Sequence, residues 1–159
     1  MSLSFDDLMN LVKNGREHFL KHIHGIRDDQ WDWKPYVECK SPRETLLHLL
    51  GNDKTALHSL QTGKAPDWAE FYNETERDIP KLLALMSEAR NSLIGYLTEN
   101  YADKPLGTEI IMWGETIKLG LALAAIPCED YYHAGQIAFI RQATDHTWDY
   151  YAAIYEFGG

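Results

Sequence analysis

Apolar residues recur at intervals of three and four along four long stretches of the chain, which is the spacing of amphipathic helices. The first helix is expected over about residues 4–26. The second is expected over residues 42–62, because Ser41 is a favourable N-cap, Pro42 suits the first helical position and Gly63 is a stop signal. The start of this second helix is therefore predicted by capping chemistry as well as by periodicity.

The second half of the chain predicts two more long helices, separated by irregular sequence. The third helix is expected from residue 73 or 75 to about residue 100, and the fourth from about 115–118 to 143, with a bend at Pro127. Between them, residues 101–118 contain a proline, two glycines and a β-branched apolar run, so we expect extended structure, a short hairpin or a lid. Residues 147–157 predict a short final helix.

Together these elements predict an all-α protein with a single domain over residues 1–159. Four amphipathic helices joined by modest connectors are typical of an up-down four-helix bundle. The bundle is expected to carry a short irregular or hairpin-like insert before the last long helix and a short C-terminal helix.

Two ionisable residues interrupt the apolar face of the fourth helix. Glu129 and His133 fall in the series that runs from Ile126 to Ile137 at steps of three and four. A buried charge is costly unless it is paired or bound to a metal. A metal would need at least one further ligand from another helix, and the best candidate is His48, which lies where a leucine is expected in the second helix.

Periodicity alone leaves other interpretations of these residues open. A histidine in an apolar stripe is often a hydrogen-bonded core residue, and Glu129 can form an ion pair with no metal. A second pair at helical spacing, His18 and His22, is expected at the surface. The tryptophans, Trp113 among them, are expected in the core or in an interface rather than around a ligand.

The charge balance excludes several classes of partner. The chain has 15 basic and 24 acidic residues, a net charge of −9, with no basic cluster. We therefore expect neither nucleic-acid nor membrane binding. The two cysteines, Cys39 and Cys128, have no partner at metal-ligand spacing and are expected to be free thiols. No apolar stretch is long enough for a membrane span and no secretion signal is apparent, so a cytoplasmic location is expected.

Several short motifs resemble one family. They are Ser41-Pro42 opening a helix with His48 seven residues on, the run Tyr132-His133-Ala134-Gly135-Gln136-Ile137 followed by Arg141, and the aromatic segments Trp31-x-Trp33-Lys-Pro35 and Trp113-Gly114. This pattern, over roughly residues 4–143, resembles the DinB-like superfamily, which includes YfiT-type proteins. The resemblance implies a four-helix bundle, often dimeric, that binds a divalent metal.

The resemblance also implies which residues bind the metal. In the family one histidine comes from the second helix and a His-x-x-x-His pair from the fourth; His48 and His133 match the first and last of these. Glu129 stands at the place of the middle histidine, which makes a set of two histidines and one carboxylate. Zinc or nickel is expected for such ligands, and iron(II) also fits. Gln136 and Asn52 are expected to orient the ligands or line the pocket.

The function implied by the resemblance is metal-dependent catalysis. The protein is expected to activate water or a low-molecular-weight thiol for attack on a small electrophile, as a thiol transferase or a hydrolase does. The alternative is a non-catalytic stress-response protein that binds a metal or ligand with the same bundle. A small-molecule substrate and a homodimer are expected in either case.

Overall fold

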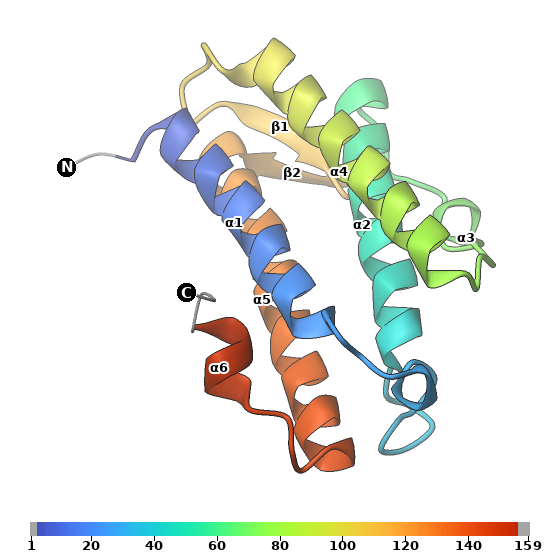
Figure 1. The fold of residues 1–159 in the computed structure, drawn as a ribbon. Helices are drawn as coiled ribbons and strands as arrows, with labels where there is room; N and C mark the ends of the chain where they lie inside the picture. Colours follow the sequence, from blue (N-terminus) through green and yellow to red (C-terminus); the bar gives the residue numbers. More distant parts are fainter. Residues whose placement is uncertain (1–2, 156–159) are drawn as a thin grey trace.

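The structure is a computed structural model that describes residues 3–155, and it is mostly helical with one small sheet (Figure 1). This confirms the predicted helical class. The elements in chain order are α1 (Phe5–Ile23), the 3₁₀ turn η1 (Asp28–Gln30), α2 (Pro42–Thr62), α3 (Trp68–Phe71), α4 (Ile79–Tyr101), β1 (Glu109–Met112), β2 (Glu115–Lys118), α5 (Leu119–Thr144) and α6 (Tyr150–Ile154).

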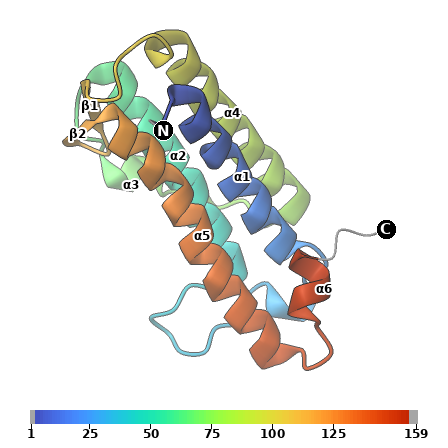
Figure 2. The ribbon, with the colours of Figure 1, turned by 90° about the vertical axis from the view of Figure 1, so that its left-hand side faces the viewer.

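The four long helices do not alternate in direction along the chain. One apolar cluster joins the first halves of α1 and α5 to the second halves of α2 and α4. A second cluster joins the second halves of α1 and α5 to the first halves of α2 and α4. Hence α1 and α5 run in one direction and α2 and α4 in the other (Figures 1 and 2). The predicted up-down order is wrong, because residues 63–78 carry the chain back along the molecule before α4 begins.

Helix α1 packs closely against α5, and a glycine makes this approach feasible. A Cβ atom at Gly15 would lie 2.8 Å from the Cβ of Pro127, so a larger residue would force the two helices apart. Pro127 lies inside α5, which continues through it as one helix. The small residue on α1 and the proline on α5 therefore set the spacing of this helix pair.

The helix ends follow capping chemistry. Ser4 and Ser41 each form a capping box with the acidic residue three positions on. The third long helix starts later than predicted, because the Asp78 side chain accepts a hydrogen bond from the Lys81 amide and Pro80 occupies the first turn. Helix α1 likewise stops short of the predicted end, before Gly25.

Residues 109–118 form the hairpin that the sequence predicts as one of its alternatives. Strands β1 and β2 pair antiparallel, and the turn residues Trp113 and Gly114 have φ angles of 54° and 85°. Two positive φ angles match the twist of the strands, as in tight hairpin turns. Because residues 115–118 are a strand, α5 begins at Leu119, one residue after the predicted range of starts.

The short helix α6 lies within the predicted range 147–157, whose last two residues fall outside the described part of the chain. Arg141, a residue of the family pattern, connects this end of α5 to α1. Its guanidinium donates hydrogen bonds to the carbonyls of His22, His24 and Gly25. It also lies 4.3 Å from the centre of the Trp148 ring. Its structural role is therefore to tie the C-terminal segment to the end of α1.

A layer of buried charges separates the two apolar clusters. Arg16, Asp53, Arg90 and Asp130 come one from each long helix, and each arginine contacts both aspartates at 2.8–3.1 Å. Asp130 is fully buried, whereas the side chain of Glu129 is 42% exposed. The prediction that Glu129 faces the core is therefore wrong: α5 turns Asp130 towards the core and leaves Glu129 at the edge of the buried face.

Candidate metal centre

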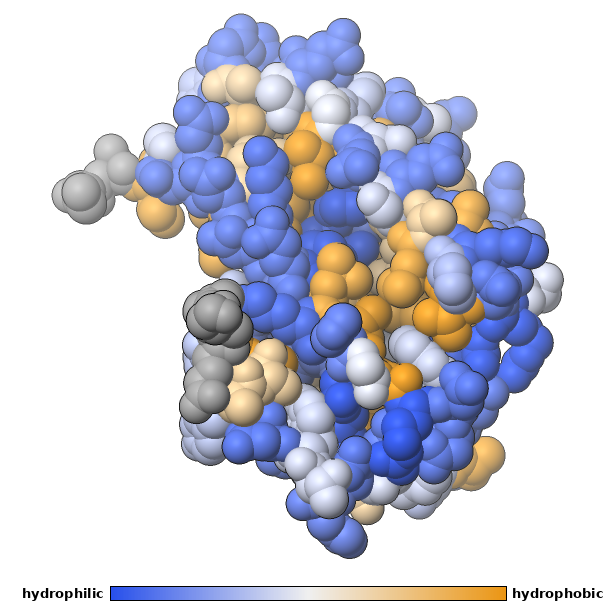
Figure 3. All heavy atoms as spheres, viewed as in Figure 1, coloured by the Kyte–Doolittle hydropathy of each residue, from blue (hydrophilic) through white to orange (hydrophobic). Residues whose placement is uncertain are grey.

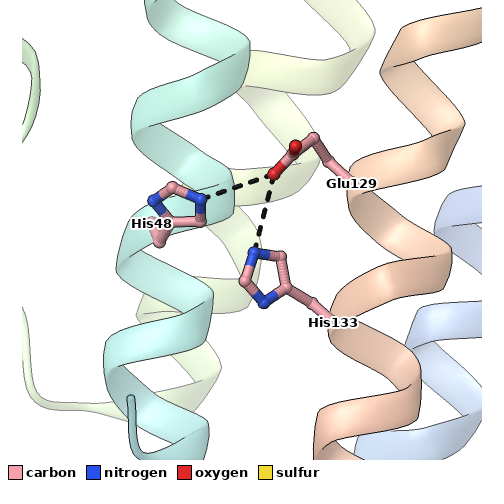
Figure 4. Close-up of side chains that lie close together, drawn as sticks. All are labelled: His48, Glu129 and His133. Carbon is pink, nitrogen blue, oxygen red and sulfur yellow. Dashed lines mark ion pairs between the residues drawn. The ribbon is translucent and has the colours of Figure 1, made fainter. Parts of the chain in front are cut away.

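Three side chains from two helices point towards one another (Figure 4). His48 comes from α2, and Glu129 and His133 lie one turn apart on α5. Their ligand atoms all lie within 4.8 Å of one another. The Glu129 Oε2 atom is 3.5 Å from Nε2 of His48 and 3.6 Å from Nε2 of His133. The structure therefore brings together the three residues that the sequence predicts as ligands.

The orientation of His133 is fixed by Gln136. The His133 side chain is almost fully buried, and its Nδ1 lies 2.7 Å from the Gln136 Oε1. An amide oxygen only accepts hydrogen bonds, so Nδ1 carries the hydrogen of the neutral ring and donates it. The opposite nitrogen, Nε2, then has a free lone pair that points to Glu129. Gln136 thus has the orienting position that the sequence predicts.

Asn52 lies one turn after His48 on α2 and faces the same carboxylate. Its Nδ2 donates to Glu129 Oε2 at 3.1 Å and lies 3.4 Å from His48 Nε2. The hydroxyl of Tyr72 donates to the Asn52 Oδ1, which fixes the amide so that the NH₂ group faces the cluster. Burial raises the pKa of Tyr72 to about 12, so the phenol keeps the hydrogen that it donates. The predicted place of Asn52 beside the ligands agrees with this geometry.

Tyr72 reaches Asn52 because α2 carries a glycine at the point of contact. A Cβ atom at Gly51 would lie 2.6 Å from the Tyr72 ring. The ring therefore packs directly on the backbone of α2, beside His48, whose ring centre is 5.8 Å away. Sequence periodicity did not identify Tyr72, because it lies in the connector between α2 and α4.

The donor set of the cluster suits a cation. A glutamate side chain is ionised at neutral pH, so Glu129 offers a carboxylate oxygen. The separations of 3.5 and 3.6 Å are longer than ordinary hydrogen bonds. They are close to the ~3.4 Å that separates two ligands on one tetrahedral metal ion. Two imidazole nitrogens and a carboxylate oxygen that lie this close together form a donor set that a positive ion between them would stabilise.

A cleft of about 750 Å³ opens beside this cluster. His48 and Glu129 line it, and Trp68, Tyr72 and Trp113 contribute aromatic rings. The indole Nε1 of Trp113 donates to the backbone carbonyl of Asn52 at 3.1 Å, which attaches the hairpin to α2. Trp113 packs against the first apolar cluster, as predicted, and it also lines the cleft, which was not predicted. Its position in a Trp-Gly turn was the one available signal.

Other candidate residues lie apart from the cluster. His22, predicted at the surface, is buried, with its Nδ1 2.8 Å from the carbonyl of His18, to which it donates. The reason is that His22 falls on the core-facing side of α1. Cys39 and Cys128 are both free, as predicted, and Cys128 lies in the cleft wall.

The fold and the site define a class: a mostly helical protein with a candidate two-histidine, one-carboxylate metal centre between two of its long helices. A family model described as the DinB superfamily matches residues 11–137, and the chain belongs to that superfamily. A comparison with curated proteins found no match. Within residues 3–155, no helix combines the length and the apolar character needed to cross a bilayer.

Proposed function

We propose that His48, Glu129 and His133 bind a divalent metal ion and that the protein is a metal-dependent enzyme. It would activate water or a low-molecular-weight thiol for attack on a small electrophile, in a thiol-transferase or hydrolase reaction. The observation that carries this proposal is the convergence of two imidazole nitrogens and a carboxylate oxygen, with His48 and Glu129 also lining a cleft. Zinc or nickel suits these ligands best, and iron(II) also fits.

A bound metal of this kind supplies Lewis acidity, which lowers the pKa of a coordinated water or thiol and generates the nucleophile at neutral pH. The protein residues supply orientation. Gln136 keeps the Nε2 lone pair of His133 directed at the cluster, and Asn52 holds the Glu129 oxygen. With His48, Glu129 and His133 as the protein ligands, a bound metal would still be able to accept water or substrate.

The proposal is tested by measuring metal content in protein purified without an affinity tag. We expect close to one equivalent of metal per chain, loss of that metal in His133→Ala, and retention in His146→Ala, which changes an exposed histidine elsewhere. Bound metal should also raise the melting temperature, and a chelator should lower it. Less than about 0.2 equivalents in the parent chain, unchanged by His133→Ala, would contradict the proposal.

Turnover distinguishes the enzyme from the non-catalytic alternative. Thiol cofactors screened against common electrophiles should show a rate that depends on the metal and falls in Glu129→Gln. Metal binding without any such rate would instead identify a binding protein, for which the carboxylate at position 129 in place of a histidine is the supporting observation.

We also propose that the protein is a homodimer. Leu121, Tyr132 and Phe139 are exposed large apolar side chains that repeat along one face of α5. Light scattering on the parent chain should give twice the mass of one chain, and Phe139→Glu should shift the equilibrium towards the monomer. A monomer at all accessible concentrations would contradict the dimer and leave the metal centre unaffected.

A further inference from the structure

The cleft beside the candidate metal centre has one wall of aromatic rings and one of small or aliphatic residues. Trp68, Tyr72 and Trp113 form the aromatic wall, and the aliphatic wall comes from the first part of α5. The residues of that second wall are Leu121, Ala124 and Ala125. His48 and Glu129, which project towards each other from α2 and α5 in Figure 4, also line the cleft.

Charge is distributed unevenly around the cleft. Among the described residues that line it, none is a lysine or an arginine, and Glu129 is the one acid. An anionic group on a ligand would therefore find no cationic side chain among these lining residues, and it would meet the carboxylate of Glu129.

Two of the three aromatic rings, those of Trp113 and Tyr72, lie against the backbone of α2. The Trp113 indole donates to the Asn52 carbonyl at 3.1 Å from a tight turn, where Trp113 itself has a φ of 54°. Tyr72 packs on Gly51, and its ring centre lies 6.0 Å from that of Trp68. A non-glycine residue at positive φ is an unfavourable conformation that persists where surrounding contacts require it. The rings therefore present a preformed surface.

We propose that this cleft takes a substrate with a flat, apolar body that is neutral or cationic. The metal-binding group of that substrate would point to His48 and Glu129, a part that rests on the proposed function. Flat unsaturated groups gain from stacking on aromatic rings, and cations gain from their faces. Thiols that carry several carboxylates, by contrast, would place negative charge along walls that offer no compensation. The volume of about 750 Å³ is an ample space for one drug-sized molecule.

The test uses the full chain after chelator treatment, so that it does not depend on metal binding. Four small probes of similar size are compared: 2-phenylethanol, 2-phenylethylamine, 3-phenylpropionate and 2-cyclohexylethanol. Dissociation constants are measured by ligand-observed NMR and by tryptophan fluorescence. We expect phenylethanol and phenylethylamine to bind about threefold to tenfold more tightly than cyclohexylethanol, from stacking. The dissociation constant of phenylpropionate should be at least about five times that of phenylethanol, because its carboxylate is repelled by that of Glu129.

Substitutions inside and outside the cleft test whether the probes bind there. Trp68→Leu changes an exposed cleft residue and should weaken phenylethanol binding about threefold to tenfold while leaving the melting temperature unchanged. Tyr151→Leu, which changes an exposed aromatic residue of α6 away from the cleft, should leave the dissociation constant unchanged. Glu129→Gln should reduce the difference between the dissociation constants of phenylethanol and phenylpropionate. The tighter binding of phenylethanol than of cyclohexylethanol should remain.

Three results would overturn the inference: equal binding of the phenyl and cyclohexyl probes, tightest binding of phenylpropionate, or no effect of Trp68→Leu. None of them would bear on metal retention, which is measured separately. Conversely, a chain that binds no metal can still show the predicted probe preferences. Failure of the substrate class and failure of the metal centre are thus distinguishable.

Discussion

Two neighbouring carboxylates on α5 have opposite environments. Asp130 is fully buried and contacts Arg16 and Arg90 at 2.8 and 2.9 Å. Glu129 is partly exposed and faces two imidazoles. Breaking a buried ion pair leaves an uncompensated charge in the core, whereas a carboxylate at the edge of a cleft is free to bind a ligand. At the scale of single residues, Asp130 is therefore placed to stabilise the fold, and Glu129 is placed to bind a ligand.

This contrast predicts opposite effects for two matched substitutions. Asp130→Asn should lower the free energy of unfolding by roughly 3–5 kcal/mol, because Arg16 and Arg90 lose half of their compensation. Glu129→Gln should change stability little in the metal-free protein and weaken zinc binding at least tenfold, because an amide is a poor ligand for zinc. Chemical denaturation and zinc titration measure the two quantities. Equal loss of stability in both variants would contradict the assignment.

A second prediction concerns the hydrogen bond to His133. Gln136→Leu removes the acceptor that fixes the Nδ1–H form of the ring. Zinc affinity should fall about tenfold to a hundredfold, as for other residues that orient metal-binding histidines. Gln142→Leu, on an exposed position of the same helix, serves as the control. If the two leucine variants bind zinc equally well, Gln136 does not orient the ligand.

At the scale of elements, the connectors decide how the cleft is built. The hairpin brings Trp113 to α2, and the α2–α4 connector brings Tyr72 to the same asparagine. The hairpin could be anticipated from its Trp-Gly turn and β-branched residues. The path of residues 63–78 could not, because hydrophobic periodicity carries no information on the direction in which a long connector crosses the molecule.

The contact of Tyr72 with α2 predicts a difference between two glycine substitutions. Gly51→Ala would place a methyl group against the Tyr72 ring, which should destabilise the fold by about 1–3 kcal/mol and weaken zinc binding through Asn52. Gly95→Ala, in the middle of α4 with open space around it, should instead stabilise the helix by about 0.5–1 kcal/mol. Thermal unfolding and zinc titration check both. If Gly51→Ala changed neither the stability nor the zinc affinity, the close packing of Tyr72 on α2 would be contradicted.

The buried imidazole of His22 on α1 predicts that the stability of the fold depends on pH. Burial lowers the pKa of His22, against a smaller opposing effect of its hydrogen bond to the His18 carbonyl. The unfolded chain, with an ordinary histidine pKa of about 6.5, then binds more protons than the folded one. Stability should fall as the pH drops below about 6.5, and His22→Gln should reduce this slope by at most ~1.4 kcal/mol per pH unit.

Chelator-treated protein is used for this measurement, so that metal release does not contribute. His146→Gln, which removes an exposed histidine, should leave the slope as it is in the parent chain. An identical slope in His22→Gln and the parent chain would mean that His22 titrates alike in both states.

At the scale of the whole molecule, a charged layer divides the core into two apolar clusters at the level of the candidate site. Asp53 follows Asn52 directly, and Asp130 follows Glu129, so the layer fixes the two helices from which the ligands project. The layer has no net charge and satisfies all but one of its buried guanidinium nitrogens, Nη1 of Arg16. Its position behind the ligands links the stability of the fold to the geometry of the site.

The long helices, their N-caps and the three candidate ligands could be predicted from the sequence. Glu129 and His133 interrupt the apolar series of the fourth helix, and His48 stands where a leucine is expected in the second. The family pattern then showed that Glu129 occupies the place of a histidine. The sequence does not predict the charged layer, because Asp130 or Asp53 alone is expected at the surface unless the arginines that contact it are known. Distant pairs of this kind become visible only when the helices are placed in space.

The most direct test of the metal centre is a crystal structure of the zinc-loaded protein with diffraction data collected on both sides of the zinc absorption edge. The proposal predicts one strong anomalous peak in contact with Nε2 of His48, a carboxylate oxygen of Glu129 and Nε2 of His133. A peak at another place, or a zinc ion bound by the histidines with Glu129 turned away into solvent, would contradict it.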